Sequence, residues 1–150
     1  MNTREWRIWI GRILIGAVFL MNVQAAVLFL WRPGNFAPAF ELGGVVGTAA
    51  IRGIGLLFLM WTVPYFVALL NPVKYRISLY EALAMQSIGV AGESILLFSL
   101  PPGHPTLEGA ILRFVIFDSL GLLALLLAVW VTYTPAGVPG RDPSTGVMRG

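Results

Sequence analysis

The sequence has 150 residues, of which 57% are hydrophobic and only 11% are charged, and its mean hydropathy is +0.81. A soluble domain usually carries about 25% charged residues, so this chain has too little polar surface to coat a water-soluble particle. We interpret the formal net charge of +3 as a sign of loop orientation in a membrane protein, with no nucleic-acid partner. Cysteine is absent, which excludes disulfide exchange, thiolate catalysis, iron–sulfur ligation and cysteine-ligated zinc.

Four apolar stretches are long enough to cross a bilayer, because a spanning helix needs about 20 residues. They cover residues 8–31, 47–70, 78–100 and 108–133. The first stretch exceeds the apolar run of about 7–15 residues in a signal peptide, and no convincing cleavage site follows it, so we expect a retained anchor. The sequence therefore predicts an all-α four-helix transmembrane bundle over residues 1–134 and a disordered tail, rich in Pro and Gly, over 135–150.

Basic residues outside the helices gather on one side if the chain crosses four times. They are Arg4, Arg7, Lys74, Arg76, Arg141 and Arg149. The loops on the opposite side contribute only Arg32, so the positive-inside rule predicts that both termini are cytoplasmic in a multi-pass protein of the bacterial inner membrane. The first connection, residues 32–46, has two interpretations: a surface loop or a short segment lying in the membrane interface.

Polar residues inside the apolar stretches are informative because each is costly in a bilayer. The ionisable ones are Arg52, Glu93, Arg113 and Asp118, and the amides are Asn22, Gln24 and Gln86. Counting from the helix ends places Arg52 and Arg113 at a depth of about 8 Å, Glu93 at about 10 Å and Asp118 at about 15 Å. Polar groups from four helices are thus expected at similar depths in the outer half of the bundle.

Helical phase predicts which of these residues face inward. Ala82, Gln86, Gly89 and Glu93 share one face of the third helix, because they recur at spacings of three and four. The same spacing relates Thr48, Arg52 and Gly55 in the second helix, and Phe114, Asp118 and Gly121 in the fourth. We therefore expect Arg52, Glu93 and Asp118 to point into the bundle.

The remaining polar residues are predicted to divide between the interior and the surface. Arg113 lies about 140° around the helix from Asp118 and is expected to extend to the outer surface. Asn22 and Gln24 cannot both face inward, and the sequence leaves open which one does.

The start of the first helix, Arg12-Ile-Leu-Ile-Gly16-Ala-Val-Phe19-Leu20, resembles that of DoxX-like membrane proteins. These, with the related BphX-like proteins, are bacterial four-helix proteins of similar length. The glycine-rich second helix, residues 47–59, is compatible with that pattern. Some members are linked to quinone-coupled redox complexes, so the resemblance implies an accessory membrane role.

Two interpretations of the polar cluster stay open. In the structural one, Arg52 pairs with Glu93 or Asp118 and only fixes helix register. In the functional one, the chain is a non-catalytic subunit or small-molecule-binding protein, whose pocket is lined by Arg52, Glu93, Asp118 and Asn22, with Gln86 in the same cluster. No cofactor is firmly implied, but a lipid-like or quinone-like ligand fits such a pocket. The expected partners are the lipid bilayer and another membrane protein or a second copy of the chain.

Two other functions are weighed against this one. An oligomeric proton-coupled transporter or channel needs a polar path across the membrane. Gln86, Glu81 and Tyr80 are candidates for part of such a path. A membrane enzyme with Glu93 and Asp118 as acid and base lacks a nucleophile, a metal-ligand set or a cofactor motif. His104 is the only histidine, and no supporting spacing makes it a metal or haem ligand.

Overall fold

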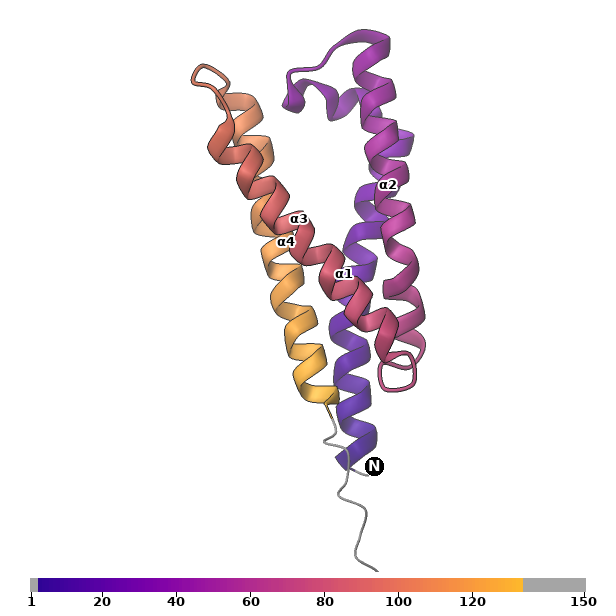
Figure 1. Ribbon diagram of the computed structural model, residues 1–150. Coiled ribbons are helices and arrows are strands. Elements are labelled where there is room, and N and C mark those ends of the chain that lie inside the picture. The colour runs from indigo at the N-terminus through magenta and orange to yellow at the C-terminus, as the bar shows by residue number, and fades with distance from the viewer. Residues whose placement is uncertain (1–2, 134–150) are drawn as a thin grey trace, which may run out of the picture.

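The computed structural model describes residues 3–133 and is helical throughout its regular structure (Figure 1). Its elements are α1 (Thr3–Trp31), η1 (Pro33–Asn35), η2 (Ala37–Phe40), α2 (Gly44–Leu70), α3 (Arg76–Ser99) and α4 (Pro105–Thr132). Each of the four α-helices is long and apolar enough to cross a membrane. The predicted all-α four-helix bundle is therefore confirmed, whereas the predicted tail at 135–150 lies outside the described residues.

All four helices begin earlier than the apolar stretches indicated. α4 begins at Pro105 rather than Glu108, because proline is favoured in the first turn of a helix, where its missing N–H is not needed. α1 begins at Thr3 rather than Ile8. The apolar count missed this start because the first turns carry charged and aromatic residues. The helices thus extend past the apolar stretches at their starts.

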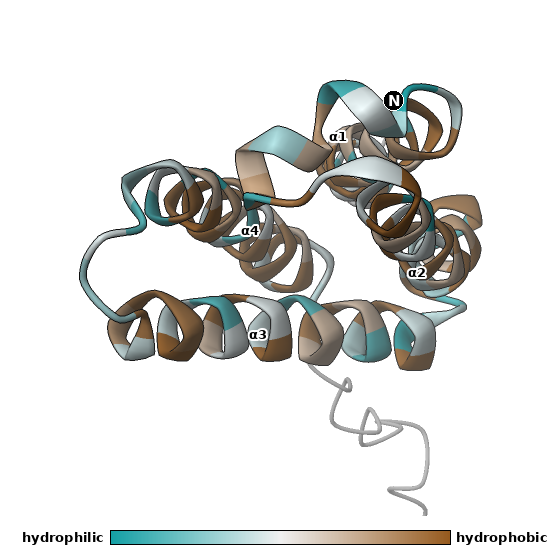
Figure 2. Ribbon diagram, turned by 90° about the horizontal axis from the view of Figure 1, so that it is seen from above, coloured by the Kyte–Doolittle hydropathy of each residue, from teal (hydrophilic) through white to brown (hydrophobic). Residues whose placement is uncertain are grey.

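The helices run alternately up and down, so that both described ends of the chain lie at one end of the bundle (Figure 1). We call this the terminal end, and the opposite end, which carries η1, η2 and the α3–α4 turn, the distal end. α1 packs most extensively on α2, and the α2–α3 contact is the smallest between neighbouring helices. α3 crosses the bundle obliquely, beside α2 near the terminal end and beside α4 near the distal end (Figures 1 and 2). α2 and α3 therefore diverge in the distal half.

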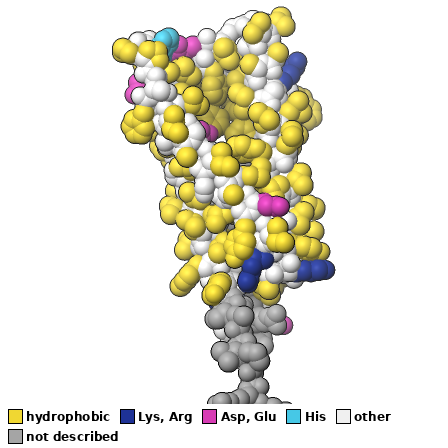
Figure 3. Space-filling view, viewed as in Figure 1, with side chains coloured by type: hydrophobic (Ala, Val, Ile, Leu, Met, Phe, Trp, Pro, Cys, Tyr) yellow, Lys and Arg dark blue, Asp and Glu magenta, His cyan; other side chains and the backbone are white. Residues whose placement is uncertain are grey.

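Two apolar clusters fill the bundle. The terminal cluster comprises Ile15, Val18, Tyr65, Ala68, Leu79, Ala82, Leu125 and Ala128. The distal cluster comprises Ala26, Phe29, Ala37, Ile51 and Phe58, with Phe36, Phe40, Ile54, Leu59 and Phe114 packed against it. Large apolar side chains also cover much of the outer surface (Figure 3). Such a surface suits a hydrocarbon solvent, in which helices need no polar coat.

Two arginines of α1 hold the terminal end together. Arg7 donates from Nε to the carbonyl of Val131 and from Nη2 to that of Tyr133, each over 2.7 Å. Arg12 donates from Nε to the carbonyl of Leu69 over 3.0 Å. The last carbonyls of a helix have no partner within the helix and carry partial negative charge. The two guanidinium groups therefore tie the ends of α4 and α2 to α1.

The first connection folds back over the distal end instead of looping away from it. η1 contacts α2 and η2 contacts both α2 and α4, and Pro33 and Ala37 are buried. Glu41 ends η2 in the left-handed conformation with φ 55°. Residues 33–40 are therefore short helical turns packed on the bundle, rather than a loop that extends away from it. This packing places the side chain of Phe40 over the interior of the bundle.

Candidate functional site

A buried hydrogen-bond network joins α2, α3 and α4 near the middle of the bundle. The Tyr65 hydroxyl donates to Gln86 Oε1 over 2.5 Å and lies 3.2 Å from the carbonyl of Ala82. Gln86 Nε2 donates to the backbone carbonyl of Asp118 over 3.1 Å and to its Oδ1 over 3.0 Å. We call Tyr65, Gln86 and Asp118 the buried network. In a low-dielectric interior, such satisfied polar groups fix the relative position of the helices that carry them.

Two glycines permit the close approach of α3 and α4 at this network. A Cβ added at Gly89 would lie 2.5 Å from Asp118 Oδ2, and one added at Gly121 would lie 2.7 Å from Gln86 Nε2. Small residues are enriched where membrane helices approach closely. Gly89 and Gly121 therefore make room for the polar side chains of the facing helix.

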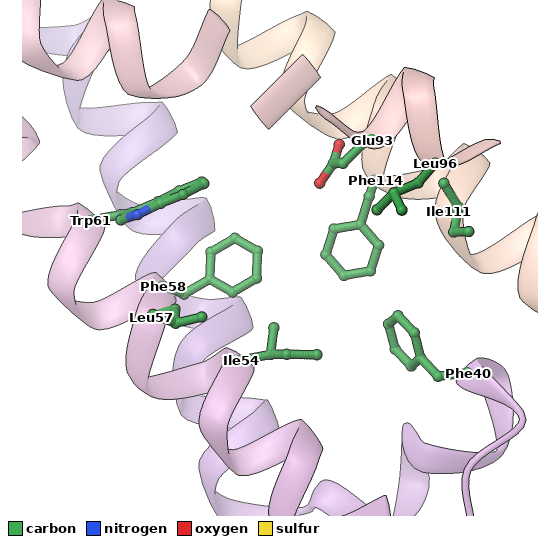
Figure 4. Close-up of a pocket in the computed structure, with 9 residues that line it drawn as sticks. All are labelled: Phe40, Ile54, Leu57, Phe58, Trp61, Glu93, Leu96, Ile111 and Phe114. Carbon is green, nitrogen blue, oxygen red and sulfur yellow. The ribbon is translucent and has the colours of Figure 1, made fainter. Parts of the chain in front are cut away.

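Glu93 lies one turn from Gly89 on α3 and enters a cavity of about 210 Å³ in the distal half of the bundle. Its lining comprises Phe40, Ile54, Leu57, Phe58, Trp61, Glu93, Leu96, Ile111 and Phe114. Figure 4 shows the carboxyl group pointing toward the space between Trp61 and Phe58 of α2 and Phe114 of α4. The face of the molecule is hollowed between α2 and α3, with an acidic side chain inside the hollow (Figure 3). We call this the Glu93 cavity.

The Glu93 carboxyl group has an unmet hydrogen-bonding capacity. Its Oε2 is buried and has no hydrogen-bond partner among residues 3–133. The rest of the lining is apolar and aromatic, and a buried polar atom without a partner costs about 1–3 kcal/mol. A bound molecule with one hydrogen-bonding group and an apolar body would remove that cost.

Aromatic rings form the floor of the cavity, a feature that the sequence interpretation did not assign to a site. The Phe58 and Phe114 rings stack with their centroids 6.0 Å apart, and the ring centroids of Phe40 and Phe114 are 5.8 Å apart. Phe29 contacts both Phe58 and Phe114. The signal available in the sequence was the concentration of phenylalanine in the segments that share the distal half, including residues 36 and 40 of the first connection.

The structure brings most of the predicted site residues inside the bundle. Asn22, Gln86 and Asp118 are buried, with exposed fractions of 3%, 2% and 2%, and Glu93 is half-buried. Gln24 is exposed and faces outward on α1. Of the two amides of α1, Asn22 is therefore the one that faces inward. Only Glu93 lines the cavity described above; Asn22 and Asp118 do not.

The prediction that Arg52 points into the bundle is wrong. Arg52 is exposed, and among residues 3–133 it forms no ion pair with Glu93 or Asp118. The buried face of α2 runs through Gly47, Ile51, Gly55, Phe58, Thr62, Tyr65 and Ala68. Arg52 follows Ile51 directly, which turns its side chain about 100° away from that face. The register-fixing ion pair through Arg52 is therefore also absent from the described residues.

The surface positions of three other residues bear on the predicted functions. Arg113 is exposed, as predicted. Glu81 and Tyr80 are exposed on α3, so they do not continue the buried network toward the terminal end. The apolar terminal cluster lies there instead. Glu81 and Tyr80 therefore lie apart from the buried network in the single chain.

A polar contact at the distal end holds η2 against the start of α4. His104 Nδ1 lies 2.5 Å from Glu41 Oε2, and the backbone N–H of Leu107 donates to Glu41 Oε1 over 3.4 Å. The hydrogen bond with His104, helped by that from Leu107, holds the pKa of Glu41 below its usual range. Because Phe40 precedes Glu41, this contact also positions one wall of the Glu93 cavity.

Replacing Glu41 with glutamine is expected to loosen this contact at neutral pH. A carboxyl group whose pKa is lowered on folding stabilises the folded state above its unfolded pKa of about 4.3, and the effect is lost as the pH falls through the lowered value. Hydrogen exchange of residues 104–108 should therefore be faster in the Glu41→Gln variant at pH 7, with the difference from wild type vanishing in acid. Equal exchange at pH 7 would show that Glu41 does not tether the turn.

Comparisons with known proteins leave the family open. No family model, curated protein or solved structure matches the chain. The resemblance to DoxX-like proteins therefore stays a prediction from the sequence. Among residues 3–133, no three histidine or acidic side chains lie together in a way that could hold a metal ion. The chemistry available at the site is that of one carboxyl group in an apolar, aromatic cavity.

Proposed function

We propose that this protein is a non-catalytic membrane protein that holds a lipid-like or quinone-like small molecule in the Glu93 cavity. The observation that carries the proposal is the buried, unpartnered Oε2 of Glu93 inside an otherwise apolar cavity. Ligand sites are typically apolar pockets with a few polar groups that fix orientation. The hollow between α2 and α3 lets a molecule enter sideways from the bilayer (Figure 3).

The lining supports a ligand with a flat or chain-like apolar body and a single polar end. Phe58, Trp61 and Phe114 offer ring faces and edges, which favour contact with another ring or with an acyl chain. A carboxyl group accepts hydrogen bonds when ionised and donates one when protonated. It can therefore pair with the hydroxyl of a lipid or a quinol, or with the carbonyl of a quinone.

The proposed setting is the bacterial inner membrane, with the terminal end in the cytoplasm. Basic residues at the terminal end, among them Arg7, Arg12, Lys74 and Arg76, support this orientation. The Glu93 cavity would then lie in the outer half of the membrane. An accessory subunit of a quinone-linked complex, the role implied by the resemblance to DoxX-like proteins, would present its ligand there to a larger partner.

Binding of decylubiquinone to the protein in nanodiscs tests the proposal, because Trp61 lines the cavity and quinones quench tryptophan fluorescence. The part of the quenching that disappears in the Trp61→Phe variant reports the cavity. Glu93→Leu is expected to weaken this binding about tenfold, the effect of losing one hydrogen bond to a charged or polar headgroup. Native mass spectrometry of the protein after gentle extraction tests for a co-purifying lipid or quinone in parallel.

Glu81→Gln is the matched control, because Glu81 is the other acidic residue of α3 and does not line the cavity. It should leave quenching unchanged. Wild-type protein that neither binds decylubiquinone through Trp61 nor retains a stoichiometric small molecule would overturn the proposal. A Glu81→Gln variant as weak as Glu93→Leu would also contradict it, because the effect would then be one of charge alone.

A further inference from the structure

The distal half holds a second cavity, which shares Phe40 and Phe114 with the lining of the Glu93 cavity. Its volume is about 470 Å³, and it lies between α1 and α4 beneath η1 and η2. Phe29, Phe36 and Phe117 make it mainly apolar, and its two polar side chains are Asn35 and Arg113. We call it the Arg113 cavity.

Arg113 is a cation without a protein partner in a segment that crosses the membrane. Its side chain is exposed, and no ion pair or hydrogen bond to another side chain engages it within residues 3–133. It lies eight residues after Pro105, the start of α4, which corresponds to about 12 Å along the helix. Arginine at such a depth extends its guanidinium toward the lipid headgroups, because leaving it in hydrocarbon is costly.

The geometry points to the Arg113 cavity as a binding site for one phospholipid, with its phosphate on Arg113 and part of an acyl chain among the phenylalanines. Guanidinium and phosphate groups are complementary in charge and form paired hydrogen bonds. The side-chain amide of Asn35 is a second donor in the same lining. The apolar remainder of the cavity has the chemistry of an acyl chain and offers nothing polar to a free phosphate ion.

Arg52 provides a matched comparison for Arg113. It lies eight residues after Gly44, the start of α2, and is exposed on the surface in the same way. It does not line the Glu93 or the Arg113 cavity. Any effect that arises merely from an arginine reaching the headgroup layer should therefore be the same for both residues, whereas lipid held in the cavity depends on Arg113 alone.

The test uses the full chain reconstituted with phosphatidylglycerol, extracted into a mild detergent, and weighed by native mass spectrometry to count retained lipids. Arg113→Gln is expected to retain phosphatidylglycerol at least about fivefold less than wild type, while Arg52→Gln retains it as wild type does. Ala25→Phe keeps Arg113 but fills the cavity from α1, so it should also lose the lipid. Folding of each variant is checked by circular dichroism before the lipids are counted.

Three results would overturn the proposal. Equal retention by the Arg113→Gln and Arg52→Gln variants would show only general attraction of arginine to headgroups. Unchanged retention in Ala25→Phe would show that no acyl chain enters the cavity. Displacement of the lipid by millimolar inorganic phosphate would show a site for the anion alone. The Glu93→Leu variant separates this site from the proposed function, because it should lower decylubiquinone binding and leave the retained phosphatidylglycerol unchanged.

Discussion

Replacing Gly89 with alanine is expected to lower the free energy of unfolding by about 1–3 kcal/mol, the usual cost of overpacking a close contact. The added Cβ would lie 2.5 Å from Asp118 Oδ2. The carboxyl group cannot turn aside freely, because Gln86 Nε2 holds its other oxygen over 3.0 Å. Either that hydrogen bond breaks or α3 and α4 move apart. Unfolding in detergent micelles by added sodium dodecyl sulfate, followed by tryptophan fluorescence, measures the loss.

Gly92→Ala is the matched control on the same helix. A Cβ at Gly92 meets no atom within 4 Å, and alanine has a higher helix propensity than glycine. The control should therefore be neutral or stabilising, so the Gly89→Ala variant is expected to be less stable than the Gly92→Ala variant. Equal stability of the Gly89→Ala and Gly92→Ala variants would contradict the close α3–α4 approach.

A double-mutant cycle isolates the contact itself. Asp118→Ala removes the carboxyl group that the new methyl group would strike, so Gly89→Ala should cost less in that background than in wild type. Residues in direct contact usually show coupling of about 0.5–3 kcal/mol, whereas independent sites show additive effects. Additive effects here would mean that the cost of Gly89→Ala arises elsewhere than at Asp118.

The inward faces of α3 and α4 were predictable because small and polar residues mark them. Ala82, Gln86 and Gly89 are buried, as their spacing predicted, and so are Asp118 and Gly121 on α4. A polar side chain in the middle of a membrane helix usually faces the interior of the bundle, because contact with hydrocarbon is costly. Glycine at the same spacing signals a close neighbour. The two signals agree on these helices, and the prediction held.

α2 shows why the same reasoning failed for Arg52. This helix is apolar on every side, so the inward face was assigned mainly from the position of Arg52. A long charged side chain near the end of a membrane helix can reach the headgroups from the outer face, so its position does not identify the inner one. Ile51 and Phe58, which do face inward, are not distinguishable by type from their lipid-facing neighbours.

A pocket was predicted, but apart from Glu93 its lining was not, because the lining depends on how the elements are placed in space. The Glu93 cavity exists because α3 tilts away from α2 toward the distal end (Figure 1), and no local pattern encodes that tilt. Phe40 reaches both cavities from a short helix that the sequence analysis left as a loop or an interfacial segment. Tyr65 was missed as a member of the buried network, although a fully buried tyrosine usually needs a partner for its hydroxyl.

Replacing Gln86 with leucine is expected to destabilise the protein by about 1–3 kcal/mol, because buried polar groups lose their partner while the side-chain volume stays similar. Three hydrogen bonds converge on the Gln86 amide. Without the Gln86 amide, Asp118 Oδ1 loses its donor, whereas the Tyr65 hydroxyl still has the carbonyl of Ala82 at 3.2 Å. Tyr65→Phe removes only one of the three hydrogen bonds to the Gln86 amide. It should therefore cost less stability than Gln86→Leu in the same unfolding measurement.

Ser87→Ala is the control for the Gln86→Leu variant, since Ser87 is exposed on the same helix and its hydroxyl donates to the carbonyl of Leu83, one turn earlier in α3. It should leave the unfolding free energy nearly unchanged. A Gln86→Leu variant as stable as the Ser87→Ala variant would show that the network does not hold the three helices.

The same variants separate a structural role of the polar groups from a ligand-binding one. Gln86 fixes the helices but does not line the Glu93 cavity, so Gln86→Leu should reduce stability and leave decylubiquinone affinity of the folded fraction close to wild type. Glu93→Leu should lower decylubiquinone affinity without reducing stability, because it removes an unpartnered carboxyl group from an apolar surrounding. If both variants lowered stability and affinity together, the two polar groups would form one unit, and the division between a structural network and a binding site would be wrong.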